Sequence, residues 1–435
     1  MKISRIVIYL GRRHTDILER SHMDESLSSI VELRCTRCGR AYDPNVAQTV
    51  CTYCLGTLFA SYDMEKAKQR FSKELLPKRV ASLWRYREML PVRQESNIIT
   101  LGEGFTPITK IESTRERLGL KQLFVKDDGI IPTGTFKSRG MTVAISKAKE
   151  LGIRKVALAS AGNAGGAAAT YSARAGIECF VFMPNDAPGS TMKECYQMGA
   201  HLYLVDGLIS DAAKFVINGK EKFGWFELST LKEPYRVEGK KTMGYEIAEQ
   251  FDWELPDVII YPTGGGTGLV GMWKAFNELE QLGWFETSES KKPRMVSVQS
   301  TGCAPVVRAF HEGKKSIDQP FENARTVAGG IRVPFPYASE QILKVIRESG
   351  GTAVDIEDSA IIKSMEMLGK DDGLYVCPEG AATLAGLEKL IEDKWIEKSE
   401  KVLMYNTGTG LKYAELVRLT KLKTFSKEES SNFDL

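Results

Sequence analysis

The stretch PTGTFKSRG, Pro132 to Gly140, surrounds one lysine, Lys137, with turn-forming residues and hydroxyl groups. A lysine alone says little, because the chain holds 59 lysines and arginines and most of them must be ordinary solvated surface. In a turn of glycine and threonine, a lysine can instead be a nucleophile that condenses with a carbonyl group. Its meaning therefore depends on the other segments that the fold brings to it.

Short β-branched or apolar runs alternate with longer helical patterns from about residue 100 onward. This alternation predicts a mostly parallel α/β architecture, in which ligands gather at the carboxyl ends of strands. At 435 residues the chain is long enough for two such lobes and a small appendage. The expected strands cover 122–126, 156–160, 178–183, 202–205, 258–262, 295–299 and 402–406, and the expected helices 145–152, 167–176, 241–251, 271–283 and 381–393.

Three glycine-rich loops follow expected strands, and each is expected to lead into a helix. VALAS continues into SAGNAGG, VIIYP into TGGGTG and VLMYN into TGTG. The first N–H groups of a helix lack partners and the helix dipole is positive there, so such a junction favours an anion. Glycine lets the backbone approach that anion closely. Three such loops in one chain indicate a shared ligand with several polar groups.

The second loop also satisfies a dinucleotide-binding pattern, because Gly266, Gly268 and Gly271 follow a strand as G-x-G-x-x-G. A dinucleotide fold would need an acidic residue at the end of the next strand to hold a ribose. That strand ends in Gln299 and Ser300. A dehydrogenase would also leave the other two loops without a role.

A lysine in a turn, a separate polyglycine loop and polar loops at other strand ends together suit pyridoxal 5'-phosphate, which has an aldehyde, a phosphate and a ring to orient. From about residue 100 to 415 the sequence resembles the fold type II pyridoxal-phosphate enzymes, the group that includes tryptophan synthase β, threonine dehydratase and threonine synthase. PTGTFKSRG is similar to the lysine segment of that group, SAGN to its asparagine loop and GGGTG to its phosphate loop.

The resemblance implies a role for each matching residue. Lys137 would form the Schiff base with the cofactor and move protons, Asn163 would hold the cofactor's O3', and Thr407 would face the pyridine nitrogen. The cofactor phosphate would lie on Gly264, Gly265, Gly266, Thr267 and Gly268, and the substrate carboxylate would meet Ser160, Ala161 and Gly162. For Ser160 and Thr407, ordinary capping at a strand end is the alternative.

The segment EPYRVEGKKTMGYEI resembles the stretch NPYR-x-EGQKT that is typical of threonine synthases. That likeness implies conversion of O-phospho-L-homoserine and water into L-threonine and phosphate. Ser138 stands where aspartate is common in the lysine segment, and the phosphate loop tends toward dehydratase-like forms. The alternatives are therefore threonine or serine dehydration, β-replacement on O-phosphoserine, and a catalytically idle binding protein. The candidate contacts for a substrate phosphate are Arg139, Arg236, Lys240 and Lys241, of which Arg236 is favoured because a guanidinium binds phosphate through two hydrogen bonds.

Four of the eight cysteines, Cys35, Cys38, Cys51 and Cys54, form a C-x2-C-x12-C-x2-C pattern. Two such turns offer four sulfurs to one ion, which predicts a zinc-ribbon-like module that binds structural zinc. With four cysteine ligands no coordination position is left for catalysis. The module would therefore be a structural cross-link, a docking surface or an inherited element without a function. A metal-free module is the alternative. The other four cysteines are expected to be buried and unreactive.

Composition restricts the partners. A net charge of +3 without basic blocks argues against nucleic acid and membrane surfaces, and no apolar run is long enough to span a bilayer. We expect a cytoplasmic homodimer that acts on a small amino acid. The expected organisation is an N-terminal extension (1–30), the zinc-ribbon-like module (31–60), a helical connector (61–99), a large cofactor-binding α/β domain (100–145 and 240–420), a small α/β domain (146–239) and a polar tail (421–435).

Overall fold

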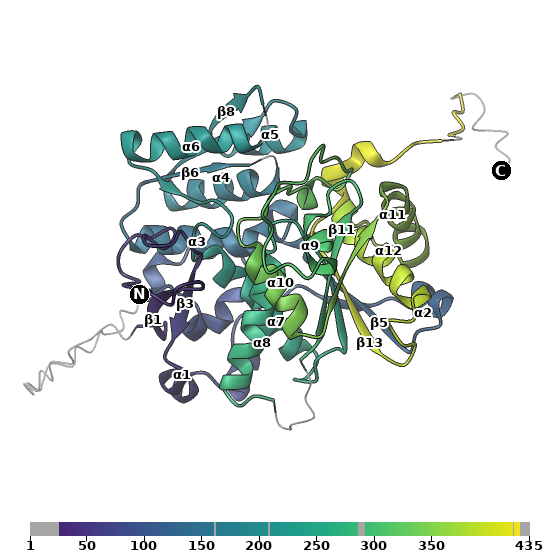
Figure 1. Ribbon diagram of the computed structural model, residues 1–435, viewed down its shortest axis with the longest axis horizontal. Coiled ribbons are helices and arrows are strands. Elements are labelled where there is room, and N and C mark those ends of the chain that lie inside the picture. Colours follow the sequence, from purple (N-terminus) through teal and green to yellow (C-terminus); the bar gives the residue numbers. More distant parts are fainter. Residues whose placement is uncertain (1–25, 161, 208, 286–291, 421, 427–435) are drawn as a thin grey trace, which may run out of the picture.

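The computed structural model describes residues 26–160, 162–207, 209–285, 292–420 and 422–426 (Figure 1). Most of the expected N-terminal extension (1–30), most of the expected polar tail (421–435) and Ala161 lie outside these residues. Three sheets organise the described chain: a small antiparallel sheet near the N-terminus, a six-stranded sheet and a four-stranded sheet.

The six-stranded sheet has the strand order β12-β11-β10-β13-β5-β4. Its neighbours pair in parallel except β4 with β5, which are antiparallel. In β10, Val258 and Ile260 pack into one apolar cluster and Ile259 and Tyr261 into another, so helices cover both faces. Burial on both faces explains why β10 is a continuous apolar run. The strands are β4 (Ile108–Lys110), β5 (Gln122–Asp127), β10 (Val258–Pro262), β11 (Arg294–Ser300), β12 (Thr352–Ile356) and β13 (Lys401–Asn406).

The four-stranded sheet has the order β8-β7-β6-β9, and all its pairs are parallel. Helix α6 packs on one face through Ala212 and Val216, while α4 and α5 pack on the other. The strands are β6 (Lys155–Ala159), β7 (Glu178–Pro184), β8 (His201–Val205) and β9 (Phe226–Glu227). Both larger sheets are thus doubly wound, which confirms the predicted fold class.

The twelve α-helices of the described residues connect and cover these sheets (Figure 1). Helices α7 and α8 pack closely together on the face of the large sheet that is turned toward the N-terminal part of the chain, and α11 and α12 pack together on its other face. The helices are α1 (Met64–Arg70), α2 (Glu112–Leu118), α3 (Lys137–Glu150), α4 (Asn163–Ala175), α5 (Gly189–Gln197), α6 (Ile209–Phe223), α7 (Arg236–Gln250), α8 (Thr267–Gln281), α9 (Pro305–His311), α10 (Ser339–Glu348), α11 (Asp358–Asp372) and α12 (Pro378–Glu392).

The N-terminal sheet has the order β2-β1-β3 and belongs to the same apolar cluster as α7 and α8. Its strands are β1 (Ile30–Cys35), β2 (Ala41–Tyr42) and β3 (Leu58–Tyr62). In the segment that follows, only α1 is an α-helix, and the rest of its helical turns are of the tighter 3-10 type at 73–78, 83–89 and 95–97. Pro77 lies inside the first of these turns, where it cannot donate the hydrogen bond that an α-helix needs.

The four-stranded sheet is drawn from residues 155–227, and the six-stranded sheet from residues 108–127 and 258–406. The domain boundaries expected from the sequence remain a proposal. Among the described residues no helix has the length and apolar character needed to cross a membrane.

Candidate active site

Helix α3 begins at Lys137, directly after a tight turn. Two successive residues of that turn have left-handed backbone, Thr133 with φ of 66° and Gly134 with φ of 64°. Such a conformation is unfavourable for threonine and persists only where neighbours hold it. The Oγ1 of Thr133 lies 2.8 Å from the Oγ of Ser138, which also donates a hydrogen bond to the Pro132 carbonyl. Ser138, the departure from the usual aspartate, thus helps to close the turn that precedes Lys137.

The lysine turn is hydrogen-bonded to the loop that follows β13. The Phe136 N–H donates to the Thr407 carbonyl at 2.9 Å, and the Thr409 N–H donates to the Gly134 carbonyl at 2.9 Å. Thr407 is buried, and its Oγ1 lies 3.6 Å from the Sγ of Cys377. Two of the segments that the sequence singles out therefore meet, although they are separated by most of the chain.

Lys137 keeps part of its surface accessible while protein atoms surround it closely. Burial is the largest cause that lowers the pKa of Lys137 to about 8, and the positive charge of Arg236 adds to it. Glu379 and Cys377 act in the opposite direction. About a tenth of an amine with this pKa is neutral at pH 7, far more than of an ordinary lysine, and the neutral form is the one that acts as a nucleophile or proton acceptor.

Arg236 and Lys240 place two more buried basic side chains near Lys137. Arg236 begins α7, is 3% exposed and donates from Nη1 to the Leu228 carbonyl at 2.5 Å. Burial lowers its pKa to about 10, partly offset by Glu233. The Lys240 ammonium bonds the Phe136 carbonyl, and burial, Lys137 and Arg236 hold its pKa well below the usual value. Burial and mutual repulsion disfavour the charged forms of these basic groups, so an anion bound among them would be stabilised and would favour their protonation.

The other two candidate phosphate contacts are engaged elsewhere. Arg139 is fully buried, with Nε 2.7 Å from Asp128 Oδ2 and Nη1 2.5 Å from Glu246 Oε1. Lys241 is also fully buried and lies 2.7 Å from Glu238 and 3.0 Å from Glu278. Breaking such buried pairs leaves uncompensated charges. The structure thus brings Arg236 and Lys240 to Lys137, and it places Arg139 and Lys241 in carboxylate networks behind the site.

The polyglycine loop joins β10 to the amino end of α8. Gly266 has φ of 76°, a conformation that favours glycine, and a Cβ there would lie 2.2 Å from Ile342. A Cβ on Gly268 would lie 1.9 Å from the hydroxyl of Tyr261, which is buried and has no hydrogen-bond partner among the described residues. These glycines thus let Ile342 and Tyr261 pack closely against the loop, and no side chain caps the first N–H groups of α8, as an anion cradle requires.

Gln299, where a dinucleotide fold would carry an acidic ribose ligand, has another task. Its Nε2 donates to the Thr263 carbonyl at 2.9 Å, and its Oε1 accepts from the Val306 N–H at 2.8 Å. The residue therefore ties the start of the polyglycine loop to α9 and offers no ribose contact.

The SAGN loop joins β6 to α4. The Oγ of Ser160 accepts from the N–H of Gly162 at 3.2 Å and from that of Gly165 at 3.0 Å, so this hydroxyl acts in capping the helix. Asn163 donates from Nδ2 to the hydroxyl of Tyr413 at 3.2 Å. Ala161 lies outside the described residues.

Two residues that the sequence reasoning missed, Glu379 and Tyr413, join these loops. Glu379 is buried in the first turn of α12, and its Oε1 accepts from the Tyr413 hydroxyl at 2.9 Å and from the Gly330 N–H at 2.5 Å. Glu379 also affects the pKa of Lys137, which places it in the same site. An acidic residue in a first helical turn is ordinary, so the sequence holds no signal for this role.

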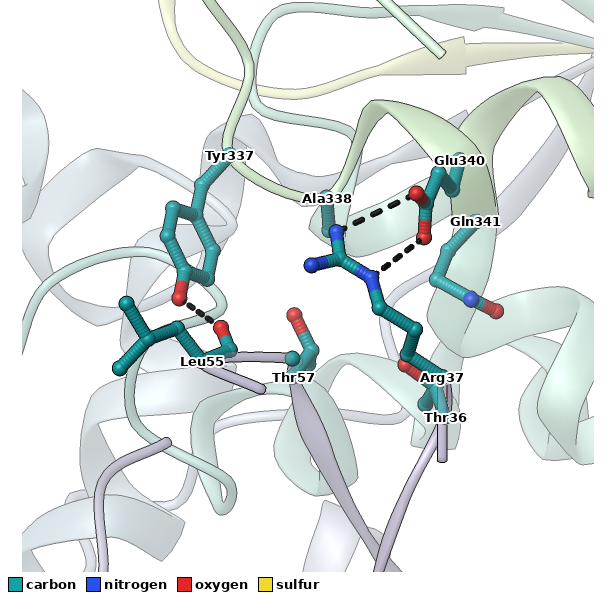
Figure 2. A pocket seen from close by; sticks show the side chains of 9 residues that line it. Thr36, Arg37, Leu55, Thr57, Tyr337, Ala338, Glu340 and Gln341 are labelled. Atoms are coloured by element: carbon teal, nitrogen blue, oxygen red, sulfur yellow. Dashed lines mark hydrogen bonds and ion pairs between the residues drawn. The ribbon is translucent and has the colours of Figure 1, made fainter. Parts of the chain in front are cut away.

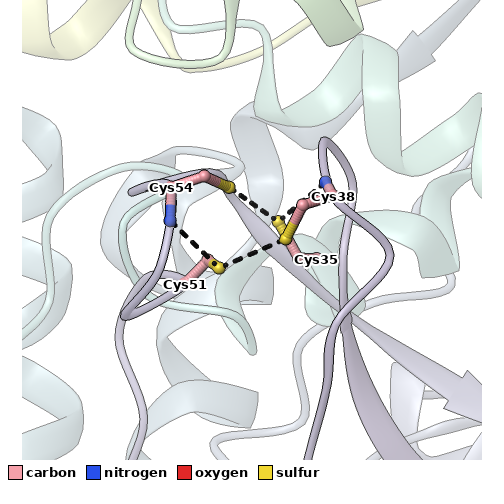
Figure 3. Close-up of side chains that lie close together, drawn as sticks. All are labelled: Cys35, Cys38, Cys51 and Cys54. Carbon is pink, nitrogen blue, oxygen red and sulfur yellow. Dashed lines mark hydrogen bonds between the residues drawn. The ribbon is translucent and has the colours of Figure 1, made fainter.

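The four cysteines of the N-terminal pattern lie together (Figure 3). Their Sγ atoms are all within 4.8 Å of one another, with Cys35 to Cys54 at 3.5 Å and Cys38 to Cys51 at 3.6 Å. Tetrahedral zinc with Zn–S bonds of about 2.3 Å separates its sulfurs by about 3.8 Å, so the cluster fits that ion. The backbone N–H groups of Cys38 and Cys54 point at the sulfurs of Cys35 and Cys51, both at 3.5 Å.

The two doubly wound sheets, the lysine at the start of α3 and the glycine cradle before α8 define the class of fold type II pyridoxal-phosphate enzymes. Residues 99–408 match the family described as "Pyridoxal-phosphate dependent enzyme". Maize serine racemase has the same fold, with a TM-score of 0.60 and 23% identity over 70% of this chain and 88% of that chain. A threonine deaminase isoform from Solanum lycopersicum also has it, with a TM-score of 0.60 and 21% identity over 75% and 90%.

Curated relatives are more similar in sequence. A threonine synthase of Methanocaldococcus jannaschii is 38% identical over 87% of this chain and 92% of its own length. One of Methanosarcina acetivorans is 37% identical over 88% and 93%. The chain belongs to the threonine synthase family of the pyridoxal-phosphate-dependent enzymes.

Proposed function

We propose that the protein converts O-phospho-L-homoserine and water into L-threonine and phosphate with pyridoxal 5'-phosphate as cofactor. The observation that carries this proposal is the buried pair Arg236 and Lys240 beside Lys137. It provides a second anion site, separate from the polyglycine loop. Threonine and serine carry no phosphate to use it, which favours a phosphorylated substrate over the dehydratase alternative.

The residues of the site fit the cofactor. The loop from Gly264 to Gly268 leads into the start of α8, which no side chain caps, and it would hold the cofactor phosphate, while Lys137 would bind the aldehyde carbon. Asn163 would orient the ring through O3', and Thr407 would face the ring nitrogen as a neutral partner. When bound, the cofactor withdraws electrons and so stabilises negative charge that develops on the substrate carbons.

Lys137 moves the protons of the reaction. With the substrate bound, the Nζ of Lys137 would accept the proton from Cα, release it, and then accept one from Cβ. The lowered pKa keeps this amine available near neutral pH. The side chain of Lys137 is attached to α3 and so holds its amine next to both carbons. Proton transfer then needs no encounter with a base from solution.

Arg236 and Lys240 act on the leaving group. The bond between Cγ and the phosphate oxygen breaks with the electron pair going to phosphate, and two nearby cations stabilise the charge that develops there. Lys137 gives the Cβ proton to Cγ, water then adds its hydroxyl at Cβ, and a proton returns to Cα. Glu233 holds the backbone of Arg236 in place, because its carboxylate accepts a hydrogen bond from the backbone N–H of Arg236 at 2.8 Å.

The substrate assignment is tested with O-phospho-L-homoserine, O-phospho-L-serine and L-threonine in parallel incubations. We expect phosphate and threonine from the first alone, and no oxoacid from L-threonine. Oxoacid release from L-threonine would identify a dehydratase. Phosphate release from O-phospho-L-serine with an added sulfur nucleophile such as sulfite would identify a β-replacement enzyme.

The protonation of Lys137 predicts how cofactor attachment depends on pH. Because only the neutral amine reacts, the rate at which cofactor added to the apoprotein acquires visible absorption should rise about tenfold per pH unit below pH 8 and level off above it. Arg236→Gln removes a positive charge that lowers the pKa of Lys137, so the midpoint of the rate-against-pH curve should move to higher pH. A rate that is flat from about pH 6.5 to 9.5 would contradict the lowered pKa.

We also propose that Cys35, Cys38, Cys51 and Cys54 bind structural zinc. Elemental analysis should give about one zinc per chain, because four thiolates complete one tetrahedral site. Cys38→Ser should lose most of that zinc and lower the melting temperature, since metal binding contributes to folding free energy. Cys195→Ser, a buried cysteine outside the cluster, is the matched control and should keep its zinc. A protein without metal and with unchanged stability in Cys38→Ser would show that the module is vestigial.

The homodimeric state and the cytoplasmic location of the protein remain predictions from its sequence.

A further inference from the structure

The N-terminal module, here residues 30–62, contacts the chain that leads to Arg236. We name residues 228–236 the approach segment. The Oγ1 of Thr57, which is 4% exposed, donates to the Leu231 carbonyl at 3.0 Å. The hydroxyl of Tyr235, which is 1% exposed, donates to the Pro44 carbonyl at 3.3 Å. These two bonds hold the middle and the end of the approach segment against the module.

The backbone that Thr57 holds is strained. Leu231 has φ of 57°, a left-handed conformation that a buried leucine adopts only when its surroundings impose it. Its neighbour Thr230 packs on the polyglycine loop, because a Cβ on Gly265 would lie 2.9 Å from the Thr230 Cγ2. The approach segment therefore touches the phosphate cradle in its middle and carries Arg236 at its end.

A second set of contacts joins the module to α10 (Figure 2). Arg37 pairs with Glu340 through two hydrogen bonds, Nε to Oε2 at 3.3 Å and Nη2 to Oε1 at 3.2 Å, and the Tyr337 hydroxyl donates to the Leu55 carbonyl. Arg37 and Leu55 each neighbour a cysteine of the cluster. Ile342 of α10 backs the phosphate cradle at Gly266. Two of the residues that pack against the cradle, Thr230 and Ile342, thus belong to segments that the module holds.

The module also contacts α7 directly. The hydroxyl of Tyr62 donates to Glu238 Oε2 at 2.8 Å, and Lys241 lies 3.9 Å from the centre of the Tyr62 ring. These residues are fully or nearly fully buried. The first turn of α7, which starts at Arg236, is therefore packed on β3, and this contact gives Lys241 a structural task.

We infer that the N-terminal module is a positioning element of the active site: it holds the approach segment and α10 so that Arg236 and the phosphate cradle keep the geometry that the substrate and the cofactor need. Thr57 is the positioning residue of this device, and metal in the cysteine cluster keeps its two turns rigid. The inference rests on the proposed function for the identity of the substrate. It needs no contact between the module and either ligand.

The test compares Thr57→Val, which removes the hydroxyl at similar volume, with Thr57→Ser, which keeps it. For Thr57→Val we expect faster hydrogen–deuterium exchange in residues 228–240 and a rise of about fivefold or more in KM for O-phospho-L-homoserine, with kcat changed less than KM. Thr57→Ser should restore slow exchange and KM. Thr49→Val is the matched control, because Thr49 Oγ1 accepts from the surface residue Lys220, at 3.2 Å, and not from the approach segment.

Metal removal tests the same coupling without a substitution. A chelator added to the cofactor-loaded protein should speed exchange in residues 30–62, in residues 228–240 and in α10, and it should weaken binding of pyridoxal 5'-phosphate measured by visible absorption. Faster exchange confined to residues 30–62, or an unchanged approach segment in Thr57→Val, would overturn the inference. If the unmodified protein does not turn over O-phospho-L-homoserine, the substrate assignment fails, while the exchange and cofactor measurements still decide the positioning role.

Discussion

Lys137→Ala should abolish the visible absorption of bound cofactor and lower kcat by at least about 10²- to 10⁴-fold, the usual contribution of a positioned proton-transfer group. The reason is that Lys137 has two tasks, attachment of the cofactor and proton transfer at Cα and Cβ. The cofactor should still bind through its phosphate, because the polyglycine loop is separate from α3. Absorption spectra and turnover of O-phospho-L-homoserine measure the two losses independently.

Lys149→Ala is the matched control for that variant. Lys149 lies on the same helix, and its ammonium donates to the Ser96 carbonyl at 2.7 Å on the surface, away from the site. Absorption and turnover should stay those of the unmodified protein. Borohydride trapping followed by peptide mapping locates the attached cofactor, and a label on any lysine other than Lys137 would refute the assignment.

Arg236→Lys should lower kcat/KM for O-phospho-L-homoserine by roughly tenfold to a thousandfold, which corresponds to about 1.5 to 4 kcal/mol. A guanidinium offers two parallel hydrogen bonds to a phosphate, and a lysine cannot reproduce them. Because lysine keeps the positive charge, the pKa of Lys137 should change little. The visible absorption of the cofactor should persist, since its phosphate is assigned to the loop before α8.

Arg139→Lys separates this effect from general destabilisation. Arg139 is bound to Asp128 and Glu246 in a fully buried network, so its replacement should reduce thermal stability rather than selectively raise KM. Kinetics are compared at a temperature where Arg236→Lys and Arg139→Lys are both folded. A similar loss of kcat/KM in the two variants would argue against a specific phosphate contact by Arg236. The dehydratase alternative would be favoured by two results together. The Arg236→Lys variant would still turn over L-threonine, and the unmodified protein would not turn over O-phospho-L-homoserine.

Much of the architecture could be predicted because it depends on local patterns. Each of the seven expected strands has a counterpart in β5, β6, β7, β8, β10, β11 or β13, since each contains a short β-branched or apolar run, even β8, whose residues are mostly exposed. Strand β12, with the sequence TAVDI, escaped because its aspartate interrupts that run. The cysteine cluster could be predicted from spacing alone, because each C-x2-C turn is local.

The candidate phosphate contacts show where pattern reading ends. Arg139, Arg236, Lys240 and Lys241 lie in two short motifs and are equivalent by charge and spacing. Packing separates them, because Arg139 and Lys241 face buried carboxylates while Arg236 and Lys240 face Lys137. No local property of a motif says which neighbours will surround each side chain.

The amino-acid sequence by itself determined the class of fold, the three loops and the four-cysteine cluster, and it singled out Lys137 as a candidate, because strand periodicity, glycine turns and cysteine spacing act within a few residues. Only the tertiary structure decided that Glu379 and Tyr413 join the loops, and that Thr57 and Arg37 hold the segments behind the phosphate cradle. Thr57 is 174 positions from Leu231, and Arg37 is 303 positions from Glu340, so no local pattern connects the partners. Burial and charge become specific only when distant segments pack together, so their consequences for chemistry are properties of the folded chain.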